Sequence, residues 1–238
     1  MVQGNVALIT GASKGIGKAI AIEFARAGVQ VFLVARNEKL LAQAKEEIER
    51  EGGKAAYFTA DLEEPGTVGQ AVDECVRVYG KIDYLVNNAA YTKAGRLEEI
   101  TKEDFDRHLY LNAYIPLEFM QKTLPYLKES KSAYIINIGS IVSFDPYENQ
   151  GAYAASKHVV KAFTKLAQRE FFDYDIRATI LSPGAVATEL IATMRPDLTD
   201  TSMFSKPEEL AKIARFLIEN RNNSAIDGIV VRRYSKKP

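Results

Sequence analysis

Short apolar runs alternate with amphipathic segments along the whole chain. The runs are rich in β-branched residues, as buried strands are, and the segments between them carry apolar residues at helical spacing. The predicted strands are residues 6–9, 29–34, 55–59, 84–86, 134–138, 178–181 and 229–231. The predicted helices are residues 16–27, 38–51, 66–79, 101–127 and 152–172, the fourth with Pro116 and Pro125 inside it.

Strands that are apolar on both faces and separated by helices predict an α/β fold, with a parallel, doubly wound sheet of seven strands. Residues 1–238 contain no repeat or linker, so we expect a single domain. Such sheets bind ligands beyond the carboxyl ends of their strands. Four unusual residues follow strands there, directly or within about two residues: Gly11, Asn87, Ser140 and Pro183.

Composition excludes several classes of protein. Lys and Arg number 31, as do Asp and Glu, so net charge gives no reason to expect nucleic acid or an anionic membrane as a partner. The single cysteine, Cys75, excludes an internal disulfide, and the isolated His108 and His158 predict no metal site. Because no apolar run reaches the roughly 18 residues of a membrane span, we expect a soluble, cytoplasmic protein.

A glycine-rich turn joins the first strand to the first helix. Glycine lets the backbone turn tightly and approach a pyrophosphate, and the helix N-terminus supplies free N–H groups. The spacing is G-x-x-x-G-x-G, which by itself also fits a turn without a ligand. The candidate cofactor-binding residues here are Gly11, Ser13, Lys14, Gly15, Ile16 and Gly17.

The end of the second strand indicates which dinucleotide binds. NAD-binding folds usually place a carboxylate there for the ribose, but this chain has Arg36 and no acid before Glu38. An arginine fork suits a 2′-phosphate, and Lys14 adds a second cation, so we expect NADP(H) rather than NAD(H). The alternative is that both cations are merely solvated. Asp61-Leu62, after the third strand, either contacts adenine or caps the next segment.

Tyr153 and Lys157 lie four residues apart on a predicted helix and therefore share a face. A phenol has a pKa of about 10, and a nearby ammonium is expected to lower it toward the range useful for proton transfer. Ser140 follows the fifth strand and can face the same space. We therefore predict an acid/base site in which serine orients the substrate, tyrosine exchanges the proton and lysine tunes the tyrosine.

Together these motifs resemble the short-chain dehydrogenase/reductase family over nearly the whole chain. The family's T-G-x-x-x-G-x-G is residues 10–17, its N-N-A-G appears as residues 87–90 with Ala90 in place of glycine, and its Y-x-x-x-K is residues 153–157. The remaining matches are the structural Asn112, the catalytic Ser140, Pro183-Gly184, Val186 and Thr188. The resemblance implies a Rossmann fold.

The resemblance also implies roles for the matched residues. Tyr153 would be the general acid for reduction and the base for oxidation. Lys157 would bind the nicotinamide ribose, and Asn112 would hold a water that links Lys157 to solvent. Asn88 and Ala89 would contact the adenosine side of the cofactor. The cofactor's carboxamide would be bound by Val186 and Thr188.

The resulting hypothesis is an NADP(H)-dependent oxidoreductase acting on a carbonyl or secondary alcohol of a small substrate, of the 3-oxoacyl or hydroxy-acid type. A short lid at about residues 189–206, which includes Arg195, favours a small substrate. The family implies a homodimer or homotetramer. Two alternatives stay open: an inactive NADP-binding regulatory protein, and a lyase or epimerase on the same scaffold. The basic tail from Arg232 to Lys237 is either a solvated end or a cover over a neighbouring subunit's site.

Overall fold

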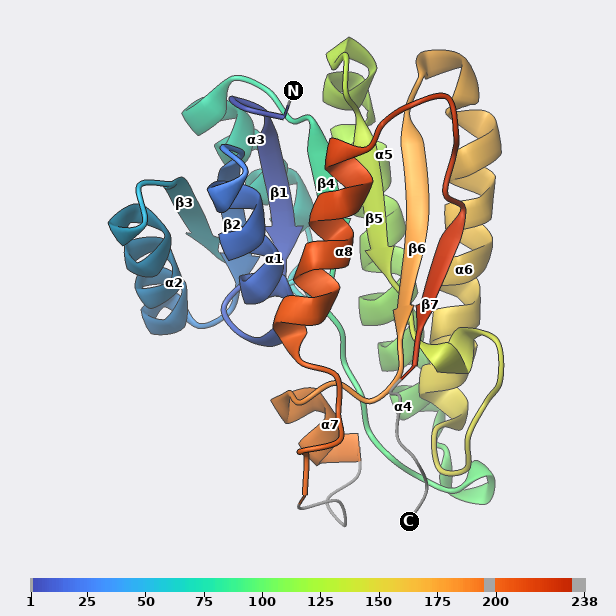
Figure 1. Ribbon diagram of the computed structural model, residues 1–238. Coiled ribbons are helices and arrows are strands. Elements are labelled where there is room, and N and C mark those ends of the chain that lie inside the picture. Colours follow the sequence, from blue (N-terminus) through green and yellow to red (C-terminus); the bar gives the residue numbers. More distant parts are fainter. Residues whose placement is uncertain (1, 195–199, 233–238) are drawn as a thin grey trace.

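In the computed structural model, which describes residues 2–194 and 200–232, the core of the molecule is a seven-stranded parallel sheet (Figure 1). The strands are β1 (Val6–Thr10), β2 (Gln30–Ala35), β3 (Lys54–Thr59), β4 (Tyr84–Asn87), β5 (Tyr134–Ile138), β6 (Arg177–Pro183) and β7 (Gly228–Val231). Their order is β3-β2-β1-β4-β5-β6-β7. The direction of winding therefore reverses between β1 and β4, where such sheets bind ligands.

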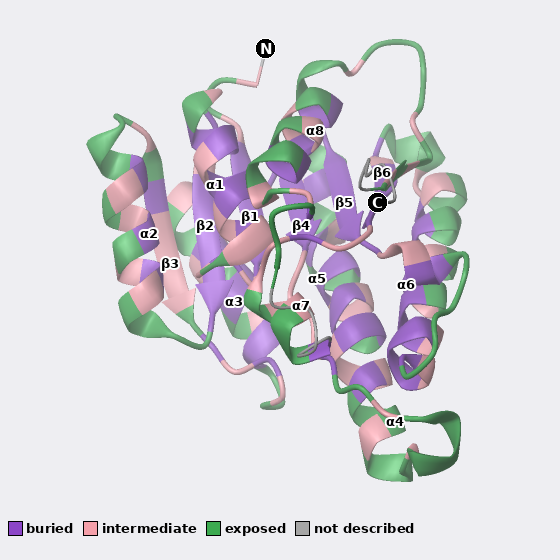
Figure 2. Ribbon diagram, turned by 60° about the horizontal axis from the view of Figure 1, so that its bottom comes forward, coloured by how far each residue is buried: buried purple, intermediate pink, exposed green. Residues whose placement is uncertain are grey.

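Helices cover both faces of the sheet, as predicted. One face carries α1 (Gly15–Arg26), α2 (Glu38–Arg50) and α8 (Pro207–Glu219), and the other carries α3 (Thr67–Tyr79), α5 (Ile115–Glu129) and α6 (Gly151–Glu170). Figure 2 shows the central strands buried between helices whose outer sides are exposed. Central strands such as β1 and β5 are buried at every position, which explains their uninterrupted apolar sequence.

Helix α8 was missed by the sequence analysis. Its signals are present: Pro207 occupies the first turn, acidic residues follow it, and buried residues recur at helical spacing. These buried residues are Leu210, Ala211, Ala214, Leu217 and Ile218. They pack beside α1, and the two helices together cover the middle of the sheet (Figure 1).

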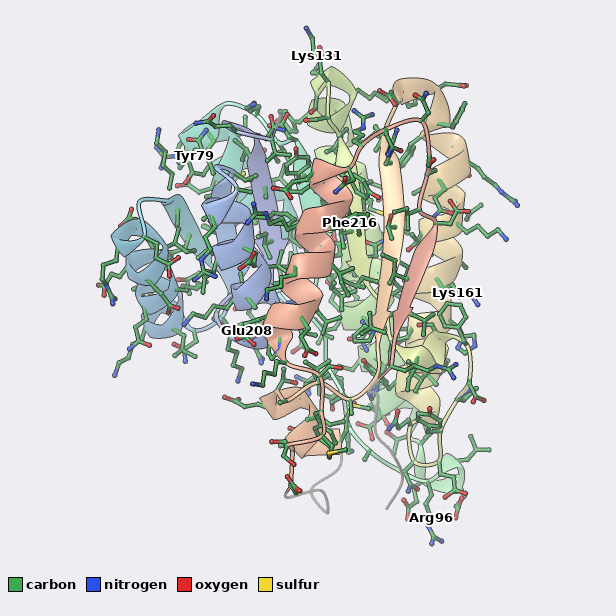
Figure 3. The ribbon with its side chains drawn as sticks, in the orientation of Figure 1. Tyr79, Arg96, Lys131, Lys161, Glu208 and Phe216 are labelled. Atoms are coloured by element: carbon green, nitrogen blue, oxygen red, sulfur yellow. The ribbon has the colours of Figure 1, made fainter. Side chains whose placement is uncertain are left out.

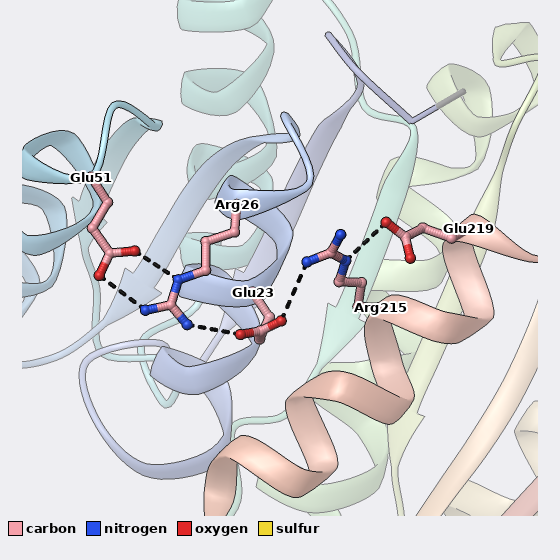
Figure 4. A network of polar contacts seen from close by, with 5 residues as sticks. All are labelled: Glu23, Arg26, Glu51, Arg215 and Glu219. Atoms are coloured by element: carbon pink, nitrogen blue, oxygen red, sulfur yellow. Dashed lines mark hydrogen bonds and ion pairs between the residues drawn. The ribbon is translucent and has the colours of Figure 1, made fainter.

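An ion-pair network ties α8 to α1 and to the end of α2 (Figure 4). Glu23, on α1, accepts a hydrogen bond from Arg26 at 2.8 Å and lies 3.6 Å from the guanidinium of Arg215 on α8. Arg26 also contacts Glu51 at 2.7 Å, and Arg215 contacts Glu219 at 2.8 Å. Each carboxylate therefore has a cationic partner, which compensates for the near-complete burial of Glu23.

The single helix predicted for residues 101–127 is divided in two. Helix α4 (Lys102–Leu109) leads into a π-helical turn, Tyr110–Tyr114, before α5 begins. Pro116 lies in the first turn of α5, where its missing N–H costs nothing. Single π turns often mark functional sites, and this one carries Asn112.

Different segments lie at the two ends of the sheet. Glu208, at the start of α8, lies at the end where the strands finish and α7 (Glu189–Met194) is placed, whereas Tyr79 and Lys131 lie at the opposite end (Figure 3). Among the described residues, no helix is both long enough and apolar enough to cross a membrane.

Candidate active site

A cleft of about 1540 Å³ opens at the carboxyl ends of the strands. It is larger than the roughly 300–1,000 Å³ of most small-molecule sites. Almost every residue that the sequence analysis selected lines it: Gly11, Ser13, Lys14, Gly15, Ile16, Arg36, Asp61, Leu62, Asn88, Ala89, Ser140, Tyr153, Lys157, Pro183, Gly184, Val186 and Thr188. Gly17 and Asn112 are buried and absent from this lining.

The glycines of the first turn have distinct reasons to be glycine. Gly11 and Gly15 adopt φ of 63° and 59°, a left-handed conformation that other residues rarely take. At Gly17 the constraint is space, because a Cβ atom would lie 2.5 Å from both Asn88 Nδ2 and the Gly11 carbonyl oxygen. Gly17 therefore shapes the turn from beneath the cleft.

Thr10 and Asn88 brace this turn against β4. The Thr10 hydroxyl oxygen accepts hydrogen bonds from the backbone N–H groups of Asn88 and Ala89, both at 3.0 Å. The Asn88 amide in return donates to the carbonyls of Thr10 at 2.9 Å and Gly11 at 3.1 Å. The family resemblance implies a contact of Asn88 with adenosine; in the structure the Asn88 side chain holds the glycine turn in place.

Three cations line the cofactor end of the cleft, in different environments. Lys14 pairs with Glu189 of α7, and Lys18 pairs with Glu47 at 2.6 Å. Within the described parts of the chain, Arg36 has no such ion pair and is exposed at the cleft. The fork of Arg36 therefore remains available to an anion.

Asp61, in the loop after β3, was expected either to contact adenine or to cap the next segment. The Asp61 carboxylate accepts the backbone N–H of Glu63 at 3.1 Å, so it caps the following turn while it also lines the cleft. Glu63 in turn binds Arg107 of α4, and the Arg107 guanidinium lies 4.2 Å from the ring centre of Tyr91. A bridge thus connects β3 to α4 along this wall of the cleft, a contact that the sequence analysis did not anticipate.

Tyr153 lies at the other end of the cleft, in an apolar cluster. It is 5% exposed, and Val142, Ala154 and Met194 are buried with it. Burial raises the pKa of the phenol to about 12, and a hydrogen bond with the Ser140 side chain acts in the opposite direction. Serine and tyrosine therefore meet, because the turn after β5 places Ser140 beside α6.

Lys157 is close to Tyr153 but does not, as had been expected, lower the pKa of the phenol. Its Nζ donates to the Ile138 carbonyl at 2.8 Å and lies 5.8 Å from the centre of the Tyr153 ring. Burial lowers the pKa of Lys157 to about 8, because the charged form loses its hydration. The sequence argument expected the ammonium to lower the pKa of Tyr153. In the structure burial raises the pKa of Tyr153, and the neighbour that lowers it is Ser140, not Lys157.

Asn112 is fully buried on the π turn. Its Oδ1 accepts the Tyr91 N–H at 2.7 Å, and its Nδ2 donates to the Tyr91 carbonyl at 2.8 Å and to the Ser156 hydroxyl at 3.0 Å. The side chain is thus engaged with the segment after β4 and with α6. The water-holding role implied by the family resemblance stays a prediction.

Apolar side chains form the wall around Tyr153. Ile141, Val142, Leu190, Ile191 and Met194 line the cleft there. They come from the loop after Ser140 and from α7, which lies in the segment 189–206 expected to act as a lid. Residues 195–199 of that segment, with Arg195, lie outside the described residues.

The aromatic residues in the loops after β4 and β5 differ in whether they reach the cleft. Tyr91 and Tyr147 line the cleft, whereas Phe144 lies outside it with the Lys161 ammonium 3.8 Å from its ring centre.

Cys75 is buried, which raises the pKa of its thiol, and His108 is buried, which lowers the pKa of its imidazole. Among residues 2–194 and 200–232, no group of three or more His, Cys, Asp or Glu is placed to hold a metal.

Known proteins resemble this chain in both sequence and structure. The family model described as short chain dehydrogenase matches residues 5–199. A 3-oxoacyl-[acyl-carrier-protein] reductase of Thermotoga maritima is 30% identical over 236 residues, which cover 96% of each chain.

Two solved structures are similar over 98% of both chains, each with a TM-score of 0.89. One is an alcohol dehydrogenase from the archaeon Thermococcus sibiricus complexed with 5-hydroxy-NADP, at 28% identity. The other is a 3-ketoacyl-(acyl-carrier-protein) reductase from Brucella melitensis complexed with NADH, at 30% identity. The match to the family model and the full-length relative show that this chain belongs to the short-chain dehydrogenase family.

Proposed function

We propose that this protein is an NADP(H)-dependent oxidoreductase that transfers hydride between the nicotinamide and a carbonyl or secondary alcohol of a small substrate. The observation that carries the proposal is the position of Tyr153, hydrogen-bonded to Ser140 and beside Lys157, in the same cleft as the glycine turn. The relatives with printed activities are reductases and an alcohol dehydrogenase, which supports the same reaction class.

The residues at the glycine end fit a dinucleotide. Gly11 and Gly15 turn the backbone sharply, and no described side chain caps the first turn of α1, so its N–H groups are free to bind phosphate. Arg36 would hold the 2′-phosphate of NADP(H), and Asp61 and Ala89 would flank the adenosine. The bound cofactor would supply or accept the hydride; the chain supplies the proton chemistry.

Tyr153 would give a proton to the substrate oxygen during reduction and take it back during oxidation. The phenol is protonated at neutral pH and can therefore donate, but its raised pKa makes it a weak acid, so proton transfer depends on neighbours that stabilise the phenolate. Ser140 would orient the same oxygen. Lys157 would hold the cofactor ribose and, as a cation, favour the phenolate left after proton transfer.

The wall around Tyr153 favours a substrate with an apolar part. Ile141, Val142, Ile191 and Met194 offer apolar surface there, and burial of such surface contributes about 25 cal/mol per Å². This supports a ketone or 3-oxoacyl compound with a short hydrocarbon portion over a highly hydrated sugar.

We also propose that residues 1–238 form one domain that assembles into a homodimer or homotetramer. One continuous sheet runs through the described residues, which supports a single domain. Apolar residues are exposed on α4, the π turn and α6, which supports an interface between copies of the chain. Phe105 is 39% exposed, Tyr114 48% and Leu166 45%. Light scattering of the purified protein tests this, and a monomer at micromolar concentration would refute it.

A substrate panel tests the proposed reaction. Aldehydes, diketones, 3-oxoacyl esters, hydroxy acids and sugars are assayed by the absorbance of NADPH, with NADH in parallel. We expect net NADPH consumption with at least one ketone or 3-oxoacyl compound. Retained nucleotide without net consumption would favour a lyase or epimerase, and nucleotide binding without any turnover would favour a regulatory protein.

A further inference from the structure

A chain of hydrogen bonds connects helix α6 to the segment that follows β4. The Ser156 hydroxyl donates to the Tyr153 carbonyl at 2.7 Å, and its oxygen accepts from Asn112 Nδ2 at 3.0 Å. Asn112 then contacts the backbone of Tyr91 through both its Nδ2 and its Oδ1. The chain therefore runs from the turn that carries the acid/base tyrosine to the wall of the cofactor cleft.

Ser156 and the Tyr91 backbone together fix which way the Asn112 amide faces. A serine hydroxyl has a single hydrogen, and here it is used on the Tyr153 carbonyl. The serine oxygen can then only accept, so the Asn112 NH₂ must point toward it. This orientation leaves Oδ1 facing the Tyr91 N–H; the flipped amide would set two donors against each other.

Burial makes this arrangement costly to disturb. Ser156 and Asn112 are each 0% exposed, so water cannot replace a lost partner. Polar networks at such positions are strong when complete and expensive when one member is missing. The Tyr91 ring is held from the side as well, with the His108 ring 4.8 Å away between centres.

We propose that Ser156 is a positioning residue, which acts through Asn112 to hold the Tyr91 backbone in register with Tyr153. The inference rests on the proposed function, because it concerns the alignment of that reaction's acid/base residue with the cofactor wall. Ser156 itself is fully buried and does not line the cleft, so it contacts neither cofactor nor substrate. Its effect on turnover is therefore one of alignment.

Helix α6 also provides a matched control. Thr164 is buried two turns further along, its hydroxyl donates to the Val160 carbonyl at 2.7 Å, and its oxygen accepts from Asn137 Nδ2 at 2.8 Å. The hydrogen-bond pattern is the same, but neither Thr164 nor Asn137 lines the cleft. Ser156→Ala and Thr164→Val each remove one such hydroxyl and should lower stability similarly.

The first measurement is turnover of the best substrate of the panel at saturating NADPH. We expect Ser156→Ala to lower kcat by about tenfold or more, since small misalignments have effects of this order, and Thr164→Val to change kcat by less than about threefold. In an Asn112→Ala background, Ser156→Ala should lower kcat by less than about twofold further, because the two residues act in one path. Equal effects of the two hydroxyl deletions, or full additivity with Asn112→Ala, would overturn the proposal.

The second measurement does not depend on activity. Exchange of the Tyr91 amide hydrogen should be about tenfold faster or more in Ser156→Ala and unchanged in Thr164→Val. Unchanged exchange in both variants would also overturn the proposal. Should the alanine variant fail to fold, Ser156→Cys, a weak donor and acceptor of similar size, takes its place with the same expectations. Failure of the proposed reaction would be seen separately, as absent turnover in the wild-type chain.

Discussion

The carboxylate of Glu189 on α7 forms an ion pair with the ammonium of Lys14 in the glycine turn, across the cofactor end of the cleft. Both side chains are more than half exposed, so the pair contributes less than about 1 kcal/mol to stability. The pair matters for the proposed cofactor site, because Glu189 neutralises a cation that we propose to contact a cofactor phosphate.

We therefore predict that Glu189→Gln tightens NADPH binding by about two- to fivefold, which corresponds to the modest strength of an exposed pair. Glu208→Gln, which removes a carboxylate from the same cleft without an observed pairing to Lys14, should have a smaller effect. Fluorescence titration of the apoprotein measures both. Weaker binding by Glu189→Gln would show that the carboxylate supports the cofactor instead.

Arg36 should determine the preference for NADPH. Because charge-assisted hydrogen bonds are worth about 1.5–3 kcal/mol, Arg36→Ala should raise the KM for NADPH by about 10- to 100-fold and leave that for NADH nearly unchanged. Lys39→Ala removes an exposed cation three residues away that does not line the cleft, and serves as the control. A wild-type preference for NADH would contradict the assignment of Arg36.

Gly17 should not tolerate a side chain. The Cβ of Gly17→Ala would lie 2.5 Å from the Gly11 carbonyl oxygen, and relief of such overpacking typically costs about 1–3 kcal/mol. We expect a lower Tm and weaker NADPH binding. Gly69→Ala, on α3 with no atom within 4 Å of the added Cβ, should instead leave Tm unchanged or raise it. Thermal unfolding with and without NADPH distinguishes the two variants. Equal Tm values for Gly17→Ala and Gly69→Ala would refute the clash at Gly17.

Tyr153→Phe should lower kcat by about 10²- to 10⁴-fold, the usual contribution of a positioned acid, and leave NADPH affinity nearly intact. Tyr79→Phe is the matched control. Burial raises the pKa of the Tyr79 phenol to about 12, as it does for Tyr153, but Tyr79 lies at the far end of the sheet (Figure 3). Retention of most of the rate by Tyr153→Phe would disprove the acid/base assignment.

The pH dependence of kcat/KM for reduction should report Lys157. Its pKa in the free protein is lowered to about 8, so its charge is present below that pH and is lost as the pH rises through it. Tyr153, with a pKa of about 12, stays protonated over the same range. We expect kcat/KM to be flat near pH 7 and to fall through pH 8. Because arginine keeps its charge, Lys157→Arg should remove this inflection from whatever activity it retains.

The strand and helix pattern, and the place of most site residues, could be predicted from the amino-acid sequence. Parallel strands end at one edge of their sheet, so residues that follow β1, β4, β5 and β6 were expected to meet there. Gly11, Ser140 and Pro183 line the cleft, whereas Asn87 is the buried last residue of β4 and does not. Helical spacing likewise placed Tyr153 and Lys157 on one face. Helix α8 was missed although its signals are ordinary, and the π turn at Asn112 has no pattern of its own.

The sequence by itself thus determined the layered α/β architecture and the residue types gathered at the cleft, because periodicity and strand ends are local properties. Only the tertiary structure decided how those residues are used. The burial that raises the pKa of Tyr153 arises from Met194 and Val142, and the pairing of Lys14 with Glu189 joins positions 175 residues apart. Desolvation and such contacts depend on the packing of distant segments, which no local pattern encodes.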